Sequence, residues 1–400
     1  MAAQTRPTTK KTTVKNNIAK FRQDRRLLVV GLFEGLGLLL MLAVLVFSIV
    51  AYQEYLNPAS LRQGLRYLGA TASQGNTALL DISPDEDAVY LPMGMGMISS
   101  SRDGFRYHSM VEDNRFQGSG NFTNPALTAG KRLALVYNRG GSDLAVMTSY
   151  GQVWNKTLDS TILSASMNPK GAFALVTNET GYRCAVTVYN NKQEILCKWL
   201  TSQYYILSAS VNHNASAFAA LCFSGNTDGM KTELMLFRVG EEKAFATVDL
   251  QNRSVCSVKY DNSGNLFILC ESGLLILNRD GNVILDRSFS GNLTGFYHRE
   301  GQLPLLVFTR AAEDGELVQL LMLDEAGKIL CDREFAGTYA DAATDGEVFH
   351  LLLSDKLISF FPKDASTTEI ACSGAASVLA GSSHCPILLY SDRAEKLKLH

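Results

Sequence analysis

The chain has 400 residues, with 37 basic and 39 acidic side chains and a formal net charge of −2. Apolar residues make up 46% and charged residues 19%, which excludes a chain that is disordered throughout. With 9 prolines and 32 glycines it is neither collagen-like nor proline-rich, and the charge balance gives no general reason to expect a nucleic-acid partner.

The charge is distributed unevenly along the chain. Residues 1–26 carry eight basic side chains and one acidic side chain, Asp24, so this segment is +7 and the rest of the chain is −9. The segment is polar, rich in threonine and poor in apolar residues. Because it cannot bury enough apolar surface to offset chain entropy, we predict a disordered basic tail over residues 1–26.

An apolar run follows from Leu27 to Ala51, with 25 residues and a single charge at Glu34. As a helix it would be about 37 Å long, which is enough to cross a hydrocarbon core of about 30 Å. A cleaved signal peptide, with a shorter apolar region of about 7–15 residues, and a buried core helix are the alternatives. We predict a transmembrane helix over residues 27–52 and a juxtamembrane linker over residues 53–76.

The flanks of this run predict its orientation. The N-terminal side holds the basic residues, whereas the C-terminal side has no Lys or Arg before Arg62. Positively charged flanks stay in the cytoplasm. We therefore predict a single-pass protein of the cell membrane, with a cytoplasmic N-terminus and an extracytoplasmic C-terminal domain.

Three residues of the span are candidates for contact with another membrane helix. Gly31 and Gly35 form a GxxxG pair, a spacing that lets two helices approach closely and would support a helix-mediated dimer. Glu34 is a charge within the apolar run, where ionisable residues often contact a partner. The alternatives are that the glycine spacing arose by chance, and that Glu34 lies shallow and hydrated or is protonated.

From about residue 77 the pattern changes to apolar or alternating runs of four to seven residues, separated by glycine, asparagine and aspartate. Such runs are typical of β-strands. The phrase ILSASMN at residues 162–168 recurs as ILSASVN at residues 206–212, and each copy is followed by a polar turn and an apolar strand. A degenerate third copy spans residues 255–270. The C-terminal domain is therefore predicted to be all-β and repetitive.

The apolar second strand of this unit can be followed along the chain at intervals of 36 to 49 residues. Trp154 and Trp199, 45 residues apart, follow two of the hairpin turns and support the same register. A period of about 40 residues with four short strands is typical of a propeller blade. The strand recurs near Met97, Leu133, Phe173, Phe218, Phe267, Leu306, Phe349 and Ile387.

We predict a β-propeller of about eight four-stranded blades over residues 77–400, with seven blades as the alternative because the first copy is irregular. A solenoid or a β-sandwich fits the repeat less well. The last copy has only three strands before the chain ends, whereas an apolar segment over residues 77–82 precedes the first full copy. We expect this segment to supply the fourth strand of the last blade, which would remove an exposed sheet edge.

Three phrases carry a resemblance to a known family: TNPALTAGKRLALVYNRGG (123–141), ILSASMNPKGAFALVTNETGY (162–182) and VTVYNNKQEI (186–195). They resemble an uncharacterised family of single-pass membrane-anchored β-propeller-like proteins from Gram-positive bacteria. The resemblance covers the anchor and most of the outer domain. Because that family has no assigned activity, the resemblance implies topology and fold, and no catalytic residue. Quinoprotein-type and WD-type blades are looser matches, because only two blades keep a tryptophan.

The residues that most often carry chemistry show no catalytic spacing. Six histidines are scattered singly, and the sequence has no HExxH, GxSxG, GxGxxG or P-loop motif. Eight cysteines lie beyond residue 183 without a CxxC pair; we interpret them as small core residues, with Cys184–Cys197 or Cys372–Cys385 bonds as the alternative. The turn at residues 138–141 carries Arg139, which is a candidate to face a ligand at the propeller rim. The alternative is a β-turn with Arg139 on the surface. We predict no catalytic, cofactor-binding or metal-binding residue.

These observations favour a membrane-anchored binding or scaffold module for a protein, peptide or cell-envelope ligand, with no nucleic acid as partner. The alternatives are a quinoprotein-like or glycosidase-like propeller enzyme with a site at the channel mouth, and an accessory or sensor subunit of a membrane complex. Carboxylates or histidines with perturbed pKa values at the mouth would indicate an enzyme. An exposed aromatic patch would indicate a binding module. The charge of −9 outside residues 1–26 favours a neutral or cationic partner over an anionic polymer.

Overall fold

The computed structural model describes residues 33, 35–46, 77–81, 88–94, 96–109, 115–226, 229–251, 253–289, 291–313, 315–381 and 384–399. The chain divides into two units, residues 1–61 and residues 62–400. In the first unit, residue 33 and residues 35–46 are helical. The predicted tail, the linker and the ends of the predicted span lie outside the described residues. No helix among the described residues is long and apolar enough to cross a membrane.

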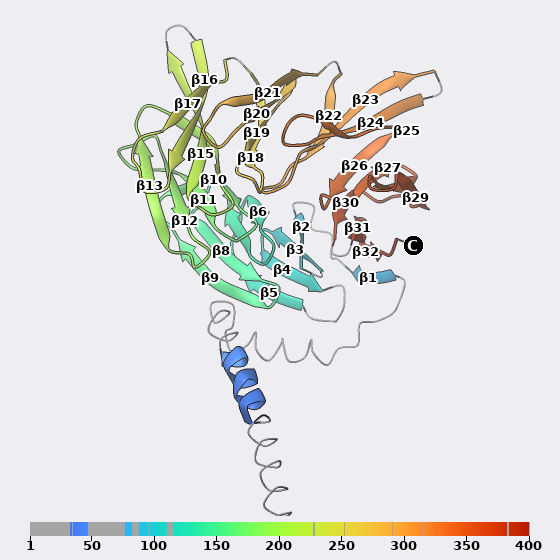
Figure 1. The fold of residues 1–400 in the computed structure, drawn as a ribbon, viewed down its shortest axis with the longest axis horizontal. Helices are drawn as coiled ribbons and strands as arrows, with labels where there is room; N and C mark the ends of the chain where they lie inside the picture. Colours follow the sequence, from blue (N-terminus) through green and yellow to red (C-terminus); the bar gives the residue numbers. More distant parts are fainter. Residues whose placement is uncertain are drawn as a thin grey trace, which may run out of the picture. The chain divides into compact units, whose positions relative to one another are not determined.

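In the second unit, the described residues contain 32 strands in eight four-stranded antiparallel sheets, which follow one another around a ring (Figure 1). We number these sheets as blades 1 to 8 in chain order. Blades 1 to 4 consist of β2 (Val89–Met93), β3 (Gly96–Ser101), β4 (Gly104–Ser109) and β5 (Arg115–Ser119); β6 (Pro125–Ala129), β7 (Ala134–Asn138), β8 (Asp143–Thr148) and β9 (Gly151–Thr157); β10 (Thr161–Met167), β11 (Phe173–Asn178), β12 (Cys184–Tyr189) and β13 (Ile195–Thr201); and β14 (Tyr205–Val211), β15 (Ala217–Asn226), β16 (Gly229–Arg238) and β17 (Ala246–Asp249).

Blades 5 to 7 have the same strand order. Blade 8 combines three C-terminal strands with β1, which pairs antiparallel with β32 so that Thr77 lies opposite Leu397 and Asp81 opposite Arg393. The strands are β18 (Val255–Tyr260), β19 (Leu266–Cys270), β20 (Gly273–Leu277) and β21 (Val283–Ser288); β22 (Leu293–Tyr297), β23 (Leu305–Ala312), β24 (Gly315–Leu323) and β25 (Ile329–Ala336); β26 (Tyr339–Thr344), β27 (Phe349–Leu353), β28 (Lys356–Phe361) and β29 (Ser366–Ala371); and β30 (Ser377–Ala380), β31 (Pro386–Leu389), β32 (Arg393–Leu397) and β1 (Thr77–Asp81).

The sequence repeat is also a structural repeat. The first strand of each of blades 3 to 7 has a β-bulge at the same place. One residue is left unpaired there, and regular pairing resumes at the next residue. The shifts in register fall between Ile162 and Ser164, Ile206 and Ser208, Val255 and Ser257, Leu293 and Gly295, and Tyr339 and Asp341. The predicted fold class, an all-β propeller, is confirmed, and the blade count is eight rather than the alternative of seven.

The two tryptophans fill equivalent gaps between neighbouring blades. Trp154 of blade 2 contacts Phe173 and Tyr189 of blade 3, with ring centroids 6.5 and 6.0 Å apart. Trp199 of blade 3 contacts Phe237 of blade 4 in the same way, at 4.4 Å. The 45-residue spacing of the tryptophans therefore reflects one packing arrangement that occurs twice.

Five of the eight cysteines are buried, as expected for small core residues. The alternative bond between Cys184 and Cys197 is wrong. Cys184 lies opposite Thr201 and Cys197 lies opposite Val188, so the two are four residues apart along the β12–β13 pair. At about 3.3 Å per residue this is roughly 13 Å, whereas a disulfide needs Cα atoms within about 7 Å.

Blade 7 contains a buried histidine, from which we predict that acid destabilises the fold. His350 is fully buried; its Nδ1 lies 3.0 Å from Ser359 Oγ, and its Nε2 has no hydrogen-bond partner among the described residues. Burial lowers the pKa of His350 from 6.5 to about 4; to a smaller extent, Asp345 raises this pKa and His384 lowers it. The unfolded chain therefore takes up a proton between pH 6.5 and pH 4 that the folded chain does not.

We expect this proton uptake to lower the free energy of unfolding by about 2 kcal/mol at pH 5 relative to pH 8. The contribution is fully present above pH 6.5 and is lost as the pH falls towards 4. His350→Gln, whose side chain does not titrate, should remove it. The check is urea unfolding of both proteins at several pH values between 8 and 5; an unchanged pH slope in the variant would contradict the assignment.

Candidate functional site

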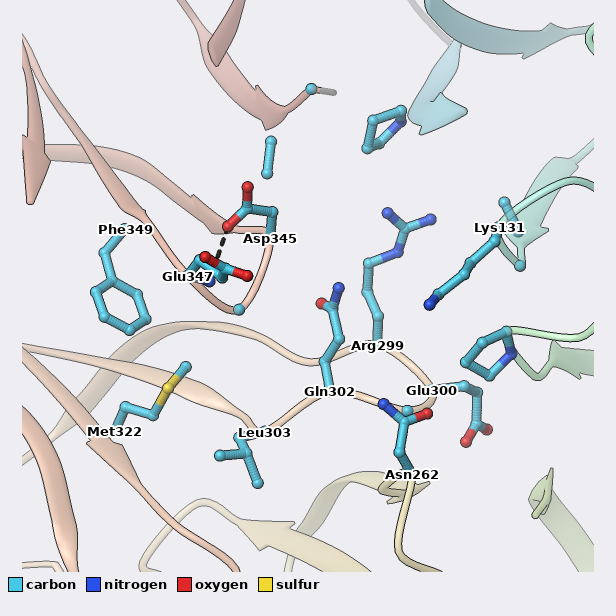
Figure 2. A pocket seen from close by; sticks show the side chains of 18 of the residues that line it. Lys131, Asn262, Arg299, Glu300, Gln302, Leu303, Met322, Asp345, Glu347 and Phe349 are labelled. Carbon is cyan, nitrogen blue, oxygen red and sulfur yellow. Dashed lines mark hydrogen bonds between the residues drawn. The ribbon is translucent and has the colours of Figure 1, made fainter. Parts of the chain in front are cut away.

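The turns between the first and second strands of the blades meet at one end of the ring, because the strands within each blade run antiparallel. They surround a cavity of about 810 Å³, which we call the channel mouth (Figure 2). Its lining comes from seven blades and includes residues 92–94 of blade 1, 129–131 of blade 2, Pro169 of blade 3, Asn262 of blade 5, 299–303 of blade 6, 345–347 of blade 7 and 380–381 of blade 8.

Short polar side chains close several of these turns. Asn168 Oδ1 accepts hydrogen bonds from the amides of Lys170 and Ala172, both at 3.0 Å. Asn212, 44 residues later, accepts from two amides of its own turn at 2.9 and 3.1 Å, and Asp261 accepts from one at 2.7 Å. The last residue of the repeated phrase is therefore a turn cap, which is a common role of Asn and Asp.

Blade 6 departs from this pattern with a longer turn. Residues 298–304 connect β22 to β23, whereas blades 3, 4 and 5 use five residues. Gly301 has a φ of +75° and its amide donates to the carbonyl of Tyr260 at 2.7 Å. A Cβ on this glycine would lie 2.4 Å from Pro169 Cγ and 2.8 Å from Asn262 Oδ1. The glycine lets the blade 6 turn lie against the turns of blades 3 and 5.

Glu300 of this turn connects blade 6 to three other blades. Its Oε1 accepts a hydrogen bond from Ser166 of blade 3, and its Oε2 accepts from Ser210 of blade 4 at 2.8 Å. The Tyr260 amide of blade 5 donates to Oε2 at 3.1 Å, and Lys259 Nζ lies 3.6 Å from Oε1. We call this carboxylate, its three hydrogen-bond donors and Lys259 the Glu300 bridge.

The electrostatics of Glu300 suit a structural carboxylate. Its side chain is only 3% exposed, and burial raises the pKa of the carboxyl; Lys259, Ser166 and Ser210 act in the opposite direction. A catalytic acid or base must reach the substrate. Both oxygens of Glu300 already accept hydrogen bonds within the protein, so its raised pKa reflects burial within the bridge and not a vacant catalytic group.

Two further side chains of the blade 6 turn carry buried polar atoms that have no hydrogen-bond partner among the described residues. These atoms are both ring nitrogens of His298 and Oε1 of Gln302. Burial, and then the charge of Lys259, lowers the pKa of His298 to about 3. The ring is therefore neutral at physiological pH.

The blade 7 side of the channel mouth is acidic, and its carboxylates have partners. Asp345 Oδ1 accepts hydrogen bonds from the amides of Glu347 and Val348 at 2.8 and 2.9 Å, and its Oδ2 lies 2.6 Å from His384 Nδ1. Although burial acts the other way, these contacts lower the pKa of Asp345. Glu347 accepts from Lys363 Nζ at 2.6 Å, which lowers the pKa of Glu347.

A second cavity, of about 610 Å³, opens beside the turns of blades 4 and 5. Most of its lining is uncharged and includes His213; its charged residues are Lys170, Arg238 and Arg279, with Asp280 as the acidic one. Burial, then the charges of Lys170 and Lys131, lowers the pKa of His213. The positive potential of this end of the ring therefore extends from blade 2 to blade 5.

At the opposite end of the ring, blades 3 and 4 present an exposed aromatic surface. Tyr182 (47% exposed) and Arg183 lie in the connection between β11 and β12, and Tyr205 (49%) and Leu207 (55%) lie at the start of β14. The Arg183 guanidinium lies 4.9 Å from the Tyr205 ring centroid and donates to the Gln203 carbonyl at 3.0 Å. We call Tyr182, Arg183, Tyr205 and Leu207 the tyrosine patch.

The β-bulge of blade 4 explains the exposure of Leu207. Regular pairing stops at Ile206 and resumes at Ser208, so Leu207 is the extra, unpaired residue. A bulge of this kind redirects a side chain away from the regular alternation. The phrase ILSAS therefore gives blade 4 an exposed apolar side chain at this end.

The three residues of the predicted span that were singled out for contact with another membrane helix stay a prediction. Gly31 and Glu34 lie outside the described residues; Gly35 is helical, and a Cβ added to it would meet nothing within 4 Å. Arg139 is exposed in a turn whose Gly140 amide donates to Ile162 at 2.7 Å, which joins blade 2 to blade 3. Within the described part of the chain, no group of three or more His, Cys, Asp or Glu side chains is arranged to hold a metal ion.

Residues 75–363 match the model of a family of unknown function, DUF5711. The chain belongs to this family. No curated protein matches this DUF5711 chain. The match and the structure confirm two parts of the resemblance, a family of unknown function and a propeller fold. The membrane anchor and the Gram-positive origin remain predictions.

Solved structures similar to the DUF5711 chain include a WD40 domain and a β-propeller domain. The C-terminal WD40 domain of Sif2 has a TM-score of 0.55 and 10% identity, covering 80% of this chain and 97% of that one. Dihydro-heme d1 dehydrogenase NirN, solved in complex with DHE, has a TM-score of 0.50 and 11% identity, covering 71% and 66%. The β-propeller domain of Myceliophteria thermophila Cps50 (Swd1) has a TM-score of 0.43 and 13% identity, covering 70% and 99%. At these identities the likeness shows the fold alone, a WD40-like propeller.

Proposed function

We propose that this propeller is a binding or scaffold module that docks a protein partner through the tyrosine patch. The observation that supports this is the composition of the patch, which combines two half-exposed tyrosines, an arginine and a leucine. Tyrosine and arginine are enriched among the residues that contribute most to protein interfaces. Arg183 stacked on Tyr205 is also held in place before binding, which reduces the entropy lost on association.

The patch is tested by recovery of partners from native membranes and envelope fractions with the full-length chain as bait. We expect Tyr205→Ala combined with Leu207→Ser to lower the affinity for a recovered protein at least about thirtyfold, the size of a strong interface contact. The matched control is Ile195→Ala, which is 55% exposed in β13 of blade 3 next to a turn at the opposite end of the ring. Recovery of the same proteins by the patch variant would contradict the proposal.

We further propose that residues 27–52 anchor the module in the cell membrane as a single-pass helix, with the propeller on the extracytoplasmic side. The basic segment before the run and the length of the run support this. Within the described residues, 35–46 are helical with apolar side chains in the open, such as Leu38 and Met41. Protease added to intact protoplasts should cut the propeller and leave residues 1–26 intact; a protected propeller would overturn this orientation.

A further inference from the structure

The acidic side chains that line the channel mouth all have hydrogen-bond or ion-pair partners on the protein. Asp345 is bound by two backbone amides and His384, and Glu347 is bound by Lys363. Glu300 is held in the Glu300 bridge, where Lys259 Nζ lies 3.6 Å from its Oε1. These carboxylates therefore do not provide a vacant negative charge for the rest of the cavity lining.

Two cations of the channel mouth have no carboxylate partner within the described ranges. Lys131 projects from the blade 2 turn, and Arg299 from the blade 6 turn, where its guanidinium donates to the Tyr297 hydroxyl at 3.3 Å. Figure 2 shows both side chains pointing into the open space of the cavity, on the side away from Asp345 and Glu347. The charge that the cavity lining leaves uncompensated is positive.

The surrounding structure increases this positive potential. Lys170 and Lys131 both act on His213 of blade 4, and the neighbouring cavity is lined by three basic side chains against one acidic side chain. A concave site with charge of one sign concentrates ions of the opposite sign, because its low-dielectric walls focus the field. The site therefore attracts anions although the chain outside residues 1–26 is net negative.

Gln302 adds a requirement for a hydrogen-bond donor on the ligand. Its Oε1 is buried without a hydrogen-bond partner in the described part of the chain, and its side chain stands beside Arg299 in Figure 2. A buried acceptor without a donor destabilises the fold, so a ligand that supplies an N–H or O–H offsets this cost. The cavity of about 810 Å³ lies within the size range of small-molecule sites.

We propose that the channel mouth binds a small molecule through an oxyanion, a carboxylate or a phosphate, held between Lys131 and Arg299, with an N–H or O–H donor of the ligand on Gln302. This site is at the other end of the ring from the tyrosine patch. It is therefore a second binding site, and its existence does not depend on the docking of a protein partner.

Calorimetric titration of the full-length chain tests the site with three probes: inorganic phosphate, N-acetylglycine and the neutral N-acetylglycinamide. We expect at least one of the two anions to bind with a dissociation constant of about 1 mM or tighter, a strength typical of ligands this small. The neutral amide should not bind. Phosphate binding alone would identify phosphates as the source of the oxyanion, and N-acetylglycine binding alone would identify carboxylates. Binding of neither anion, or equal binding of the neutral amide, would overturn the proposal.

Variants then locate the site. Lys131→Met and Arg299→Met should each weaken anion binding at least about tenfold, because each removes a charged hydrogen bond. The matched control is Lys156→Met, which removes the same charge from the exposed outer strand β9 of blade 2 and should bind like the natural protein. Arg299→Lys keeps the charge and guards against misfolding of the methionine variant, and thermal unfolding checks each protein. Equal weakening by Lys156→Met would overturn the proposal, because the effect would then reflect total charge.

Discussion

Glu300→Ala is expected to lower the free energy of unfolding by about 3–5 kcal/mol, the cost of removing one partner from a buried ion pair. The substitution leaves Lys259, whose side chain is 24% exposed, without its carboxylate, and it leaves the Ser166 and Ser210 hydroxyls and the Tyr260 amide without their shared acceptor. Because these donors belong to blades 3, 4 and 5, the loss falls on contacts between blades. Urea unfolding followed by tryptophan fluorescence measures it.

Glu300→Gln separates the charge from the hydrogen bonds. The amide oxygen still accepts hydrogen bonds, so we expect a smaller loss than for alanine. Burial raises the pKa of Glu300 in the folded protein above its ordinary value, so the folded state holds a proton more readily than the unfolded state. The natural protein should therefore gain stability relative to Glu300→Gln as the pH falls through the raised pKa.

The control for the Glu300 bridge is a carboxylate that joins two blades at the surface. Glu325 of blade 6 accepts from Ser263 of blade 5 at 2.7 Å and is exposed. We expect Glu325→Ala to cost less than about 1 kcal/mol, because exposed polar pairs contribute little. Equal losses for Glu300→Ala and Glu325→Ala would show that burial of the bridge contributes no stability.

The sequence predicts the blades because the repeat unit is local. Strand, turn and strand lie within about 40 residues, so hydrophobic alternation and the turn caps Asn168, Asn212 and Asp261 are visible in one phrase. The regular recurrence of that phrase then predicts a ring of about eight blades, which the strand order confirms. Each of these inferences depends on neighbours in the chain.

The Glu300 bridge could not be predicted in this way. Glu300 lies 134 residues from Ser166 and 90 from Ser210, in a turn that departs from the repeat. One signal was present: the two serines occupy the same position of the repeated phrase, on the strands that face the channel. A hydroxyl repeated on these strands needs a hydrogen-bond partner, but only the folded ring shows that the two serines share Glu300.

The local charge of the channel mouth could not be predicted from the sequence either. A net charge of −9 outside residues 1–26 favoured a neutral or cationic partner, but net charge is a sum over the whole surface. The channel mouth gathers Lys131 from blade 2 and Arg299 from blade 6, while its acids are satisfied locally. The charge that a ligand meets depends on which turns the ring brings together.

Phe218→Ala is expected to cost about 3–5 kcal/mol, the usual range for a buried phenylalanine reduced to alanine. Phe218 is fully buried between blades 3 and 4 and stacks on Phe237 at 4.8 Å, and Trp199 of blade 3 lies 4.4 Å from Phe237. Blade 3 has a similar arrangement one repeat earlier. Phe173 stacks on Tyr189 at 4.6 Å and is contacted by Trp154.

Phe173→Ala is therefore the matched variant, and its loss of unfolding free energy should equal that of Phe218→Ala within about 1 kcal/mol, because the two sites are copies of one packing unit. Tyr205→Ala, which removes an aromatic ring of similar size from an exposed position, should cost far less. Urea unfolding with Trp154 and Trp199 as fluorescent reporters compares all three. If Phe173 and Phe218 differed by several kcal/mol, the stability of the ring would not be divided equally among its repeats, although its geometry is repeated.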